Sequence, residues 1–288
     1  MSIKIINGIE FDPKESITMI VYGATKSGKT QLGGTFGDRT LYINIGAGIA
    51  TLYGPKFENM NGKWDGILVT AKEDDPFKPQ LFDDVCETLD DYLNDAEKQK
   101  TFDSIIIDDA TQLSESCMNK GLHWGEMLGT SHSKAKSVQV GVAMAEVQDY
   151  KAEMNLMDQF MKEYTQTCKA KGKNFIVLAH EQADYGKAPG IGLPQPIIRI
   201  RPSFTGKKNN LTSYFDNVWY MTAEGGGDKI RYIARTTRDE LIEAGTRLGG
   251  IFPERYFNPN YEEIKNALEY YHTNGKIAPI GMFFNRPK

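Results

Sequence analysis

The sequence contains little cysteine, no long apolar run and no excess of positive charge. Its three cysteines, Cys86, Cys117 and Cys168, lie far apart and form no C-x-x-C pair, which argues against a disulfide framework and favours reduced thiols. No apolar stretch reaches the ~18 residues that a membrane span needs. The N-terminal segment MSIKIINGIEFDPKES also has no uninterrupted apolar region of the kind found in secretion signals. We therefore expect a cytoplasmic protein that makes no membrane contact.

The overall charge is mildly acidic. The formal charge is −4, with 34 Lys and Arg residues against 38 Asp and Glu residues. A protein that coats nucleic acid through bulk charge is usually basic, so any nucleic-acid contact must come from a local basic patch. No repeat or low-complexity segment is present, and 40 % of the residues are hydrophobic, which is ordinary for a globular chain with a buried core.

Short apolar, β-branched runs alternate with helix-patterned stretches. Several runs are apolar on both faces, as buried parallel strands are. The predicted strands are residues 18–23, 40–45, 66–70, 104–109, 174–180, 217–222 and 230–235, and the predicted helices are 80–99, 137–170 and 260–272. This order predicts an α/β fold with a mostly parallel twisted sheet flanked by helices on both faces. We expect a single domain over residues 1–288, with a core at about 17–250 and a helical or irregular C-terminal appendage at about 251–288.

The segment VYGATKSGKTQL, residues 21–32, carries the most specific motif in the chain. A predicted strand runs into Gly23, and the spacing G-x-x-x-x-G-K-[ST] follows, which is the phosphate-binding P-loop. Its backbone N–H groups wrap the phosphates, Lys29 reaches the β- and γ-phosphates as a catalytic residue, and the Thr30 hydroxyl ligates Mg²⁺. We expect ATP and Mg²⁺ as cofactors, with the nucleotide bound by Gly23, Ala24, Thr25, Lys26, Ser27, Gly28, Lys29, Thr30 and Gln31.

The segment SIIIDDATQL supplies the carboxylate that such a site needs. Three isoleucines form a buried strand that ends in Asp108 and Asp109, and we assign Asp108 to the metal; the alternative is a solvated acidic turn. A GTPase would need N-K-x-D to bind guanine, but the only Asn-Lys pair, Asn119–Lys120, has Leu122 at the aspartate position. A small-molecule kinase is poorly supported, because it would need an arginine-rich lid over the phosphates.

The order of these elements resembles that of RecA-like ATPases, and most closely the small phage-encoded single-strand annealing ATPases of that superfamily, over about residues 17–250. GATKSGKT matches their P-loop and IIIDDATQL their second motif, while NFIVLAHE resembles the strand that ends in a polar sensor. The resemblance implies that His180 senses the γ-phosphate, with Glu181 beside it. It also implies that Arg247 reaches a neighbouring subunit of a ring or filament to stabilise transition-state charge. The alternatives are a packed histidine at a strand end and a solvated arginine.

One departure from this resemblance concerns catalysis. RecA-like enzymes carry a D-x-E pattern just after the strand that follows the P-loop helix, and its glutamate orients the attacking water. This chain has Asn44 and Gly46 at those positions, and neither can act as a base. Asp109 or Glu181 could substitute. Because general-base positioning contributes roughly 10² to 10⁴ in rate, we expect nucleotide binding with slow hydrolysis unless the loss is compensated.

Residues 182–212 are basic, rich in Gly and Pro, and predicted to be a long functional loop. Residues expected to contact DNA fall within it, with Phe204 and Tyr214 nearby; they are Arg199, Arg201, Lys207 and Lys208. A basic track with aromatic rings suits sequence-independent binding of single-stranded DNA, whereas the alternative is a solvated loop. The segment SHSKAK, residues 131–136, forms a weaker second patch.

Two functions follow from these patterns. The first is an ATP-binding protein that binds single-stranded DNA and assists annealing or recombination as a ring or filament. The resemblance then implies other phage recombination or replication proteins as partners and the host cytoplasm as the location. The second is a nucleotide-dependent assembly or scaffold factor that binds no DNA and hydrolyses little or no ATP.

Overall fold

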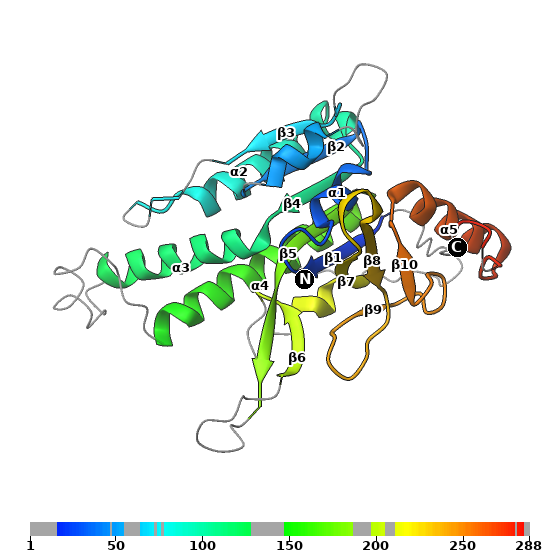
Figure 1. Ribbon diagram of the computed structural model, residues 1–288. Coiled ribbons are helices and arrows are strands. Elements are labelled where there is room, and N and C mark those ends of the chain that lie inside the picture. Colours follow the sequence, from blue (N-terminus) through cyan, green and yellow to red (C-terminus); the bar gives the residue numbers. More distant parts are fainter. Residues whose placement is uncertain are drawn as a thin grey trace.

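The computed structural model describes residues 16–46, 48–54, 64–71, 74–75, 78–127, 147–186, 197–204, 211–279 and 281–284. Within these residues ten strands form a sheet in the order β10-β8-β7-β1-β5-β4-β2-β3, with β6 paired to β5 and β9 paired to β7 (Figure 1). The strands are β1 (Thr18–Gly23), β2 (Thr40–Asn44), β3 (Ile67–Thr70), β4 (Ser104–Asp108), β5 (Asn174–Tyr185), β6 (Ile197–Pro202), β7 (Asn217–Glu224), β8 (Arg231–Arg235), β9 (Gly245–Thr246) and β10 (Arg255–Phe257).

Helices cover both faces of this sheet. The α-helices of the described chain are α1 (Lys29–Gly34), α2 (Leu81–Asn94), α3 (Ala110–Met127), α4 (Val147–Ala170) and α5 (Tyr261–Asn274). Short 3-10 turns are η2 (Gly48–Tyr53), η4 (Lys98–Thr101), η7 (Leu211–Tyr214) and η8 (Gly227–Lys229). Successive strand residues point to opposite faces, so Ile20 packs in one cluster with α2, α3 and α4, whereas Val21 packs in the other with α1 and α5.

The central strands run parallel and end at one edge. β3, β2, β4, β5, β1 and β7 are parallel to their neighbours in that order, while β8 and β10 continue the sheet antiparallel. The register pairs Gly23 with His180 and with Met221, and it pairs Asn44 with Asp108. These carboxyl ends share the edge at which open α/β sheets bind ligands. The predicted α/β fold with a mostly parallel sheet and helices on both faces is confirmed.

The predicted loop at 182–212 is in part a hairpin. β5 continues past the main sheet, and its second half pairs antiparallel with β6, with Glu181 opposite Pro202 and Tyr185 opposite Ile197. The hairpin extends away from the body of the sheet (Figure 1). The alternation of Ile and Arg in IIRIR is that of a strand with one exposed face, and the Gly- and Pro-rich flanks obscured this signal.

The segment after residue 250, expected to be a helical or irregular C-terminal appendage, packs into the core. β10 extends the main sheet by pairing with β8. Phe252, Tyr256 and Ile264 are buried in the same cluster as Val21 and Trp219. The reason is that α5 has an apolar side, which it buries against the face of the sheet that α1 covers only in part.

Two helices differ from the predicted ones. α3 begins directly after Asp109 and was not predicted, because polar residues interrupt its apolar stripe. The predicted helix 137–170 corresponds to α4, which begins at Val147 within the described residues and packs along α3. No helix of the described chain is both long and apolar enough to cross a membrane.

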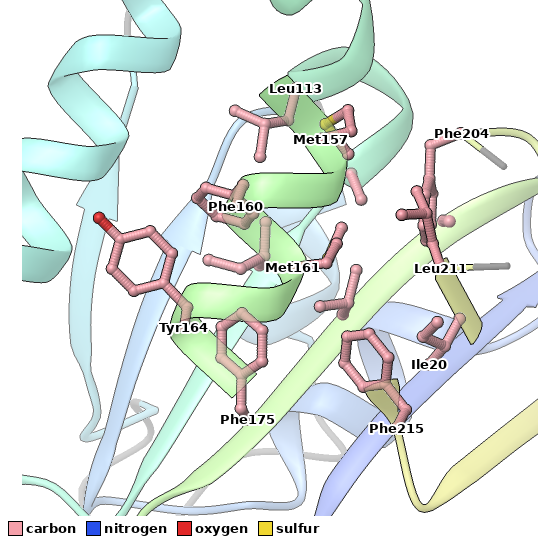
Figure 2. Close-up of a cluster of buried hydrophobic side chains, with 14 of the residues drawn as sticks. Ile20, Leu113, Met157, Phe160, Met161, Tyr164, Phe175, Phe204, Leu211 and Phe215 are labelled. Carbon is pink, nitrogen blue, oxygen red and sulfur yellow. The ribbon is translucent and has the colours of Figure 1, made fainter. Parts of the chain in front are cut away.

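Phe160 of α4 lies at the centre of the core that α2, α3 and α4 form on one face of the sheet. Its ring centroid lies 4.8 Å from that of Tyr164, 5.9 Å from that of Phe82 and 6.5 Å from that of Phe175. Figure 2 shows the ring between Tyr164 and the side chains of Leu113 and Met161. Since Phe160 is 2 % exposed, removing its ring leaves a cavity that these neighbours cannot close.

We expect Phe160→Ala to lower the free energy of unfolding by about 3–5 kcal/mol, because it loses buried apolar area and creates a cavity. Urea unfolding followed by circular dichroism measures the change. Tyr150→Ala is the matched control on the same helix, since Tyr150 is 53 % exposed, and it should change stability by less than about 0.5 kcal/mol. Equal losses in the two variants would contradict the described packing.

Candidate nucleotide-binding site

The P-loop between β1 and α1 has glycine at two positions where a side chain does not fit. A Cβ on Gly23 would lie 2.2 Å from the carbonyl oxygen of Met221 on the neighbouring strand. Gly28 has φ +92°, and a Cβ there would lie 2.5 Å from the ring of Tyr232. Glycine adopts this left-handed backbone without steric cost. The chain can therefore turn tightly from β1 into α1, as a phosphate-binding loop requires.

Lys29 is buried, and its ammonium folds back onto the loop. Its Nζ donates to the carbonyl oxygens of Gly23 and Ala24, both at 2.9 Å. Burial lowers the pKa of Lys29, and three neighbouring carboxylates oppose that shift. They belong to Asp109, Asp108 and Glu181. An ammonium has three donors, so a phosphate oxygen could accept the third, and its negative charge would offset the cost of burial.

Thr30 and Asp108 form the pair expected at a magnesium site. The Thr30 hydroxyl donates to Asp108 Oδ2 at 2.8 Å, and the Tyr42 hydroxyl donates to the same oxygen at 2.5 Å. Asp108 is 5 % exposed, and burial raises the pKa of its carboxyl group. Mg²⁺ prefers oxygen ligands and is usually held by one or two carboxylates together with substrate phosphates. The hydroxyl and carboxylate oxygens therefore fit this ion.

Asp109 joins the end of β4 to the end of β5. Its Oδ1 accepts the backbone N–H groups of Thr111 at 2.5 Å and Gln112 at 3.2 Å, which caps the start of α3. Its Oδ2 lies 3.0 Å from Nε2 of His180. The Thr111 hydroxyl in turn accepts the backbone N–H of His180 at 2.9 Å. The structure thus brings two of the predicted catalytic residues, Asp109 and His180, into direct contact.

Three buried polar atoms beside the P-loop have no hydrogen-bond partner. In the described part of the chain six buried side-chain atoms are unpaired in this way, and three of them are Ser27 Oγ, Asn44 Oδ1 and Glu181 Oε2. Nearly all buried polar groups in proteins are paired. They belong to the P-loop itself, to the end of β2 and to the residue after His180, and unpaired polar atoms at this edge are what a site for a polar ligand would show.

Several residues of this site were not found from the sequence. Tyr42 shares the metal carboxylate, Thr111 holds the backbone of His180, and Tyr232 packs on the P-loop. The phenol hydroxyl between the apolar residues Leu41 and Ile43 was the one signal for Tyr42. Thr111 and Tyr232 carried none, because their contacts arise only when distant strands pair.

Arg247 lies away from the P-loop of its own chain. β9 pairs with the first residues of β7, at Asn217 and Val218, whereas Gly23, at the P-loop end of β1, pairs with Met221 at the other end of this register. The Arg247 guanidinium is 3.1 Å from Asp216 and also donates to the carbonyl oxygen of Ser213. Its role toward a neighbouring subunit stays a prediction.

The residues predicted to contact DNA separate in the structure. Arg201 is 4 % exposed, and its Nε donates to Asp184 at 2.8 Å. The hairpin buries this charge, so Arg201 presents no surface to a nucleic-acid backbone, and its assignment is corrected. Arg199 is exposed and pairs with Glu243. Lys207, Lys208 and the patch at 131–136 lie outside the described residues.

Together, the tight P-loop with its two glycines, Lys29 and the Thr30–Asp108 pair at the edge of a mostly parallel sheet define a P-loop nucleotide-binding protein with an α/β fold. Residues 15–248 match a family described as AAA domain. The match covers most of the chain, which therefore belongs to this family.

Comparison with other proteins adds little beyond the family. Among solved structures, the flagellar accessory protein FlaH from Methanocaldococcus jannaschii is similar, with 11 % sequence identity, a TM-score of 0.40 and 84 % of each chain covered. A likeness at this TM-score is loose, and membership of the family rests on the sequence match. No curated protein matches the chain.

Because burial raises the pKa of Asp108, ionising this carboxyl group costs folding free energy. The cost is absent at low pH, where Asp108 is protonated in both the folded and the unfolded state. It is complete above the raised pKa that Asp108 has in the folded state. Asp108→Asn should therefore unfold at a higher temperature than the wild type at about pH 7, and the difference should shrink toward about pH 4.

Thermal unfolding without nucleotide at several pH values measures this difference. Asn keeps an oxygen that can accept from Thr30 and Tyr42, so the variant should fold. The control is Glu87→Gln on the exposed side of α2, which should give no such trend. A variant that is less stable than the wild type at neutral pH would contradict a net cost of ionising the buried Asp108.

Proposed function

We propose that the protein is a magnesium-dependent ATPase whose nucleotide binds at residues 23–31. The observation that carries the proposal is the Thr30–Asp108 hydrogen bond of 2.8 Å directly beside the buried Lys29 ammonium. ATP is favoured over GTP because Leu122 replaces the aspartate of the guanine motif. Membership of the AAA domain family supports the same choice.

Each residue of the site has a role in this proposal. Lys29 binds the β- and γ-phosphates, and the oxygens of Thr30 and Asp108 hold Mg²⁺, which neutralises phosphate charge when it is bound. His180, bonded to Asp109, senses whether the γ-phosphate is present. The unpaired Ser27 hydroxyl donates to the ligand, which gives this buried atom a partner.

We expect Lys29→Met to lower ATP turnover at least about 100-fold, because it removes a positive charge aimed at the phosphates. Its affinity for Mg-ATP should also fall, whereas its thermal stability without nucleotide should be kept, because a buried charge is replaced by an apolar chain of similar length. Phosphate release and isothermal titration measure the two effects. Lys100→Met, at an exposed lysine remote from the site, should match the wild type. Unchanged turnover in Lys29→Met would refute the assignment.

Single-stranded DNA is the partner that we propose for the β5–β6 hairpin. β5 runs from His180 in the site to Tyr185 at the described end of the hairpin, with a shift in its pairing register between Asp184 and Tyr185. Arg199 lies exposed on its other strand. The sequence places Lys207 and Lys208 in the connection that follows β6. In this proposal the nucleotide state controls DNA binding during annealing or recombination, with the protein assembled as a ring or filament.

A second candidate is an ATP-dependent assembly factor that binds no DNA. The observation that favours it is the pairing of the hairpin arginines, because Arg201 is held by Asp184 and Arg199 by Glu243. These pairs remove much of the positive charge on which the DNA prediction rested.

Fluorescence anisotropy with a labelled single-stranded oligonucleotide separates the two candidates. If DNA binds, the combined variant Arg199→Ala, Lys207→Ala and Lys208→Ala should bind it more weakly. The slope of log affinity against log salt should then fall by about 0.7 for each phosphate that the variant no longer neutralises. Mg-ATP affinity should stay unchanged. A wild-type protein that does not bind DNA but forms ATP-dependent oligomers, as measured by light scattering, would support the assembly factor instead.

A further inference from the structure

A magnesium-dependent ATPase needs a group that orients the attacking water, and Asp108 and Asp109 beside Lys29 already have partners. Asp109 caps α3 and pairs with His180. Oε2 of Glu181 is buried. Asn44 donates its Nδ2 to the carbonyl oxygen of Gly46 at 2.8 Å. Asp109 and Asn44 are also buried, so neither offers an exposed polar group to water beside the metal pair.

Gln112 does offer such a group. A Cβ built on Gly46 would lie 3.6 Å from both Nε2 and Oε1 of Gln112, so the carboxamide lies over this glycine. Gln112 is exposed, and it stands in the first turn of α3, where Asp109 accepts its backbone N–H. The cap fixes the backbone while the amide stays accessible to water.

The glycine beneath this carboxamide lies next to the metal pair. The backbone N–H of Ile45 donates to the carbonyl oxygen of Asp108 at 2.5 Å, and that of Gly46 donates to it at 3.3 Å. Two residues further on, a Cβ on Gly48 would lie 3.0 Å from Thr30 Oγ1 and 3.3 Å from Asp108 Oδ2. Gly46 therefore lies close to the Gln112 carboxamide, and Gly48 lies close to the two oxygens proposed for Mg²⁺.

We propose that Gln112 is the positioning residue for the attacking water. It takes the role that the glutamate has in enzymes with the D-x-E pattern, where this chain has Gly46. This inference rests on the proposed ATPase function. The carboxamide oxygen accepts a hydrogen bond from the water, and its NH₂ group donates to the γ-phosphate. A glutamine can orient water in phosphoryl transfer without removing its proton.

The reaction balances without a base. The water oxygen bonds to the γ-phosphorus, and the bond from that phosphorus to the β–γ bridging oxygen breaks. The electron pair of the broken bond leaves with ADP. One proton of the water stays on the released phosphate and the other passes to solvent. Gln112 ends the step unchanged.

Three variants test this role. Gln112→Ala should lower kcat about 100-fold or more while the affinity for Mg-ATP stays within about twofold of the wild type. Gln112→Glu should keep part of the rate. The double variant Gly46→Glu, Gln112→Ala should regain turnover, because the new carboxylate at position 46 then reaches the space that the Gln112 carboxamide occupies in the wild type. Gly46 does not have a left-handed φ, and the three atoms nearest to a Cβ there all belong to the Gln112 side chain, at 3.6–3.7 Å. With alanine at position 112 the substitution therefore gains space.

A binding measurement checks the same claim without turnover. The complex of ADP, Mg²⁺ and aluminium fluoride mimics the transferring phosphoryl group with its axial water. Gln112→Ala should bind this complex at least about tenfold more weakly than the wild type does, while both bind ADP with Mg²⁺ alone equally well. Glu115→Gln, at the next exposed position of α3, is the control and should change neither affinity nor rate.

The outcomes separate this inference from the proposed function. A wild type that turns over ATP, with Gln112→Ala equally active, would overturn the role of Gln112 alone. A wild type that binds Mg-ATP but shows no turnover would overturn both hydrolysis and the role of Gln112. Loss of ATP binding in Gln112→Ala, with the fold intact, would also overturn the inference, because it would make Gln112 a binding residue.

Discussion

The site depends on how one buried carboxylate is held at the end of an apolar strand. Asp108 follows three fully buried isoleucines and is itself 5 % exposed, a position at which an isolated charge is costly. Two hydroxyl groups, from Thr30 of α1 and Tyr42 of β2, donate to a single oxygen of this carboxylate. This shared acceptor links the P-loop to β2 and β4, so the fold fixes the relative positions of the phosphate-binding and metal-binding groups.

Much of the fold and the centre of the site could be predicted because their signals are local. The P-loop motif has a fixed residue spacing within one short segment. Asp108, which contacts the P-loop in the fold, ends a run of isoleucines that is typical of a buried strand. Strands buried on both faces give continuous apolar runs. Their order along the chain then predicts a parallel sheet, and the carboxyl ends of such a sheet meet at one edge.

The remainder depends on pairing between distant segments, which a single sequence does not encode locally. Arg201 was expected at the surface, but the antiparallel register of β5 and β6 brings Asp184 to it and buries the pair. Likewise, the local sequence around Tyr256 and Ile264 does not indicate that they belong to the main core. They are buried there because β10 pairs with β8. The carboxamide of Gln112 meets Gly46 because β2 lies beside β4, although 66 residues separate the two positions.

β5 has 12 residues and is supported unequally along its length. Its first half is held between β1 and β4, whereas its second half pairs only with β6 among the described strands. At about 3.3 Å per residue, Tyr185 lies roughly 16 Å beyond His180. A rotation displaces points in proportion to their distance from its axis. A change in the direction of the strand at His180 would therefore displace the exposed side chains of Tyr185 and Ile197 more than it displaces the residues of the site.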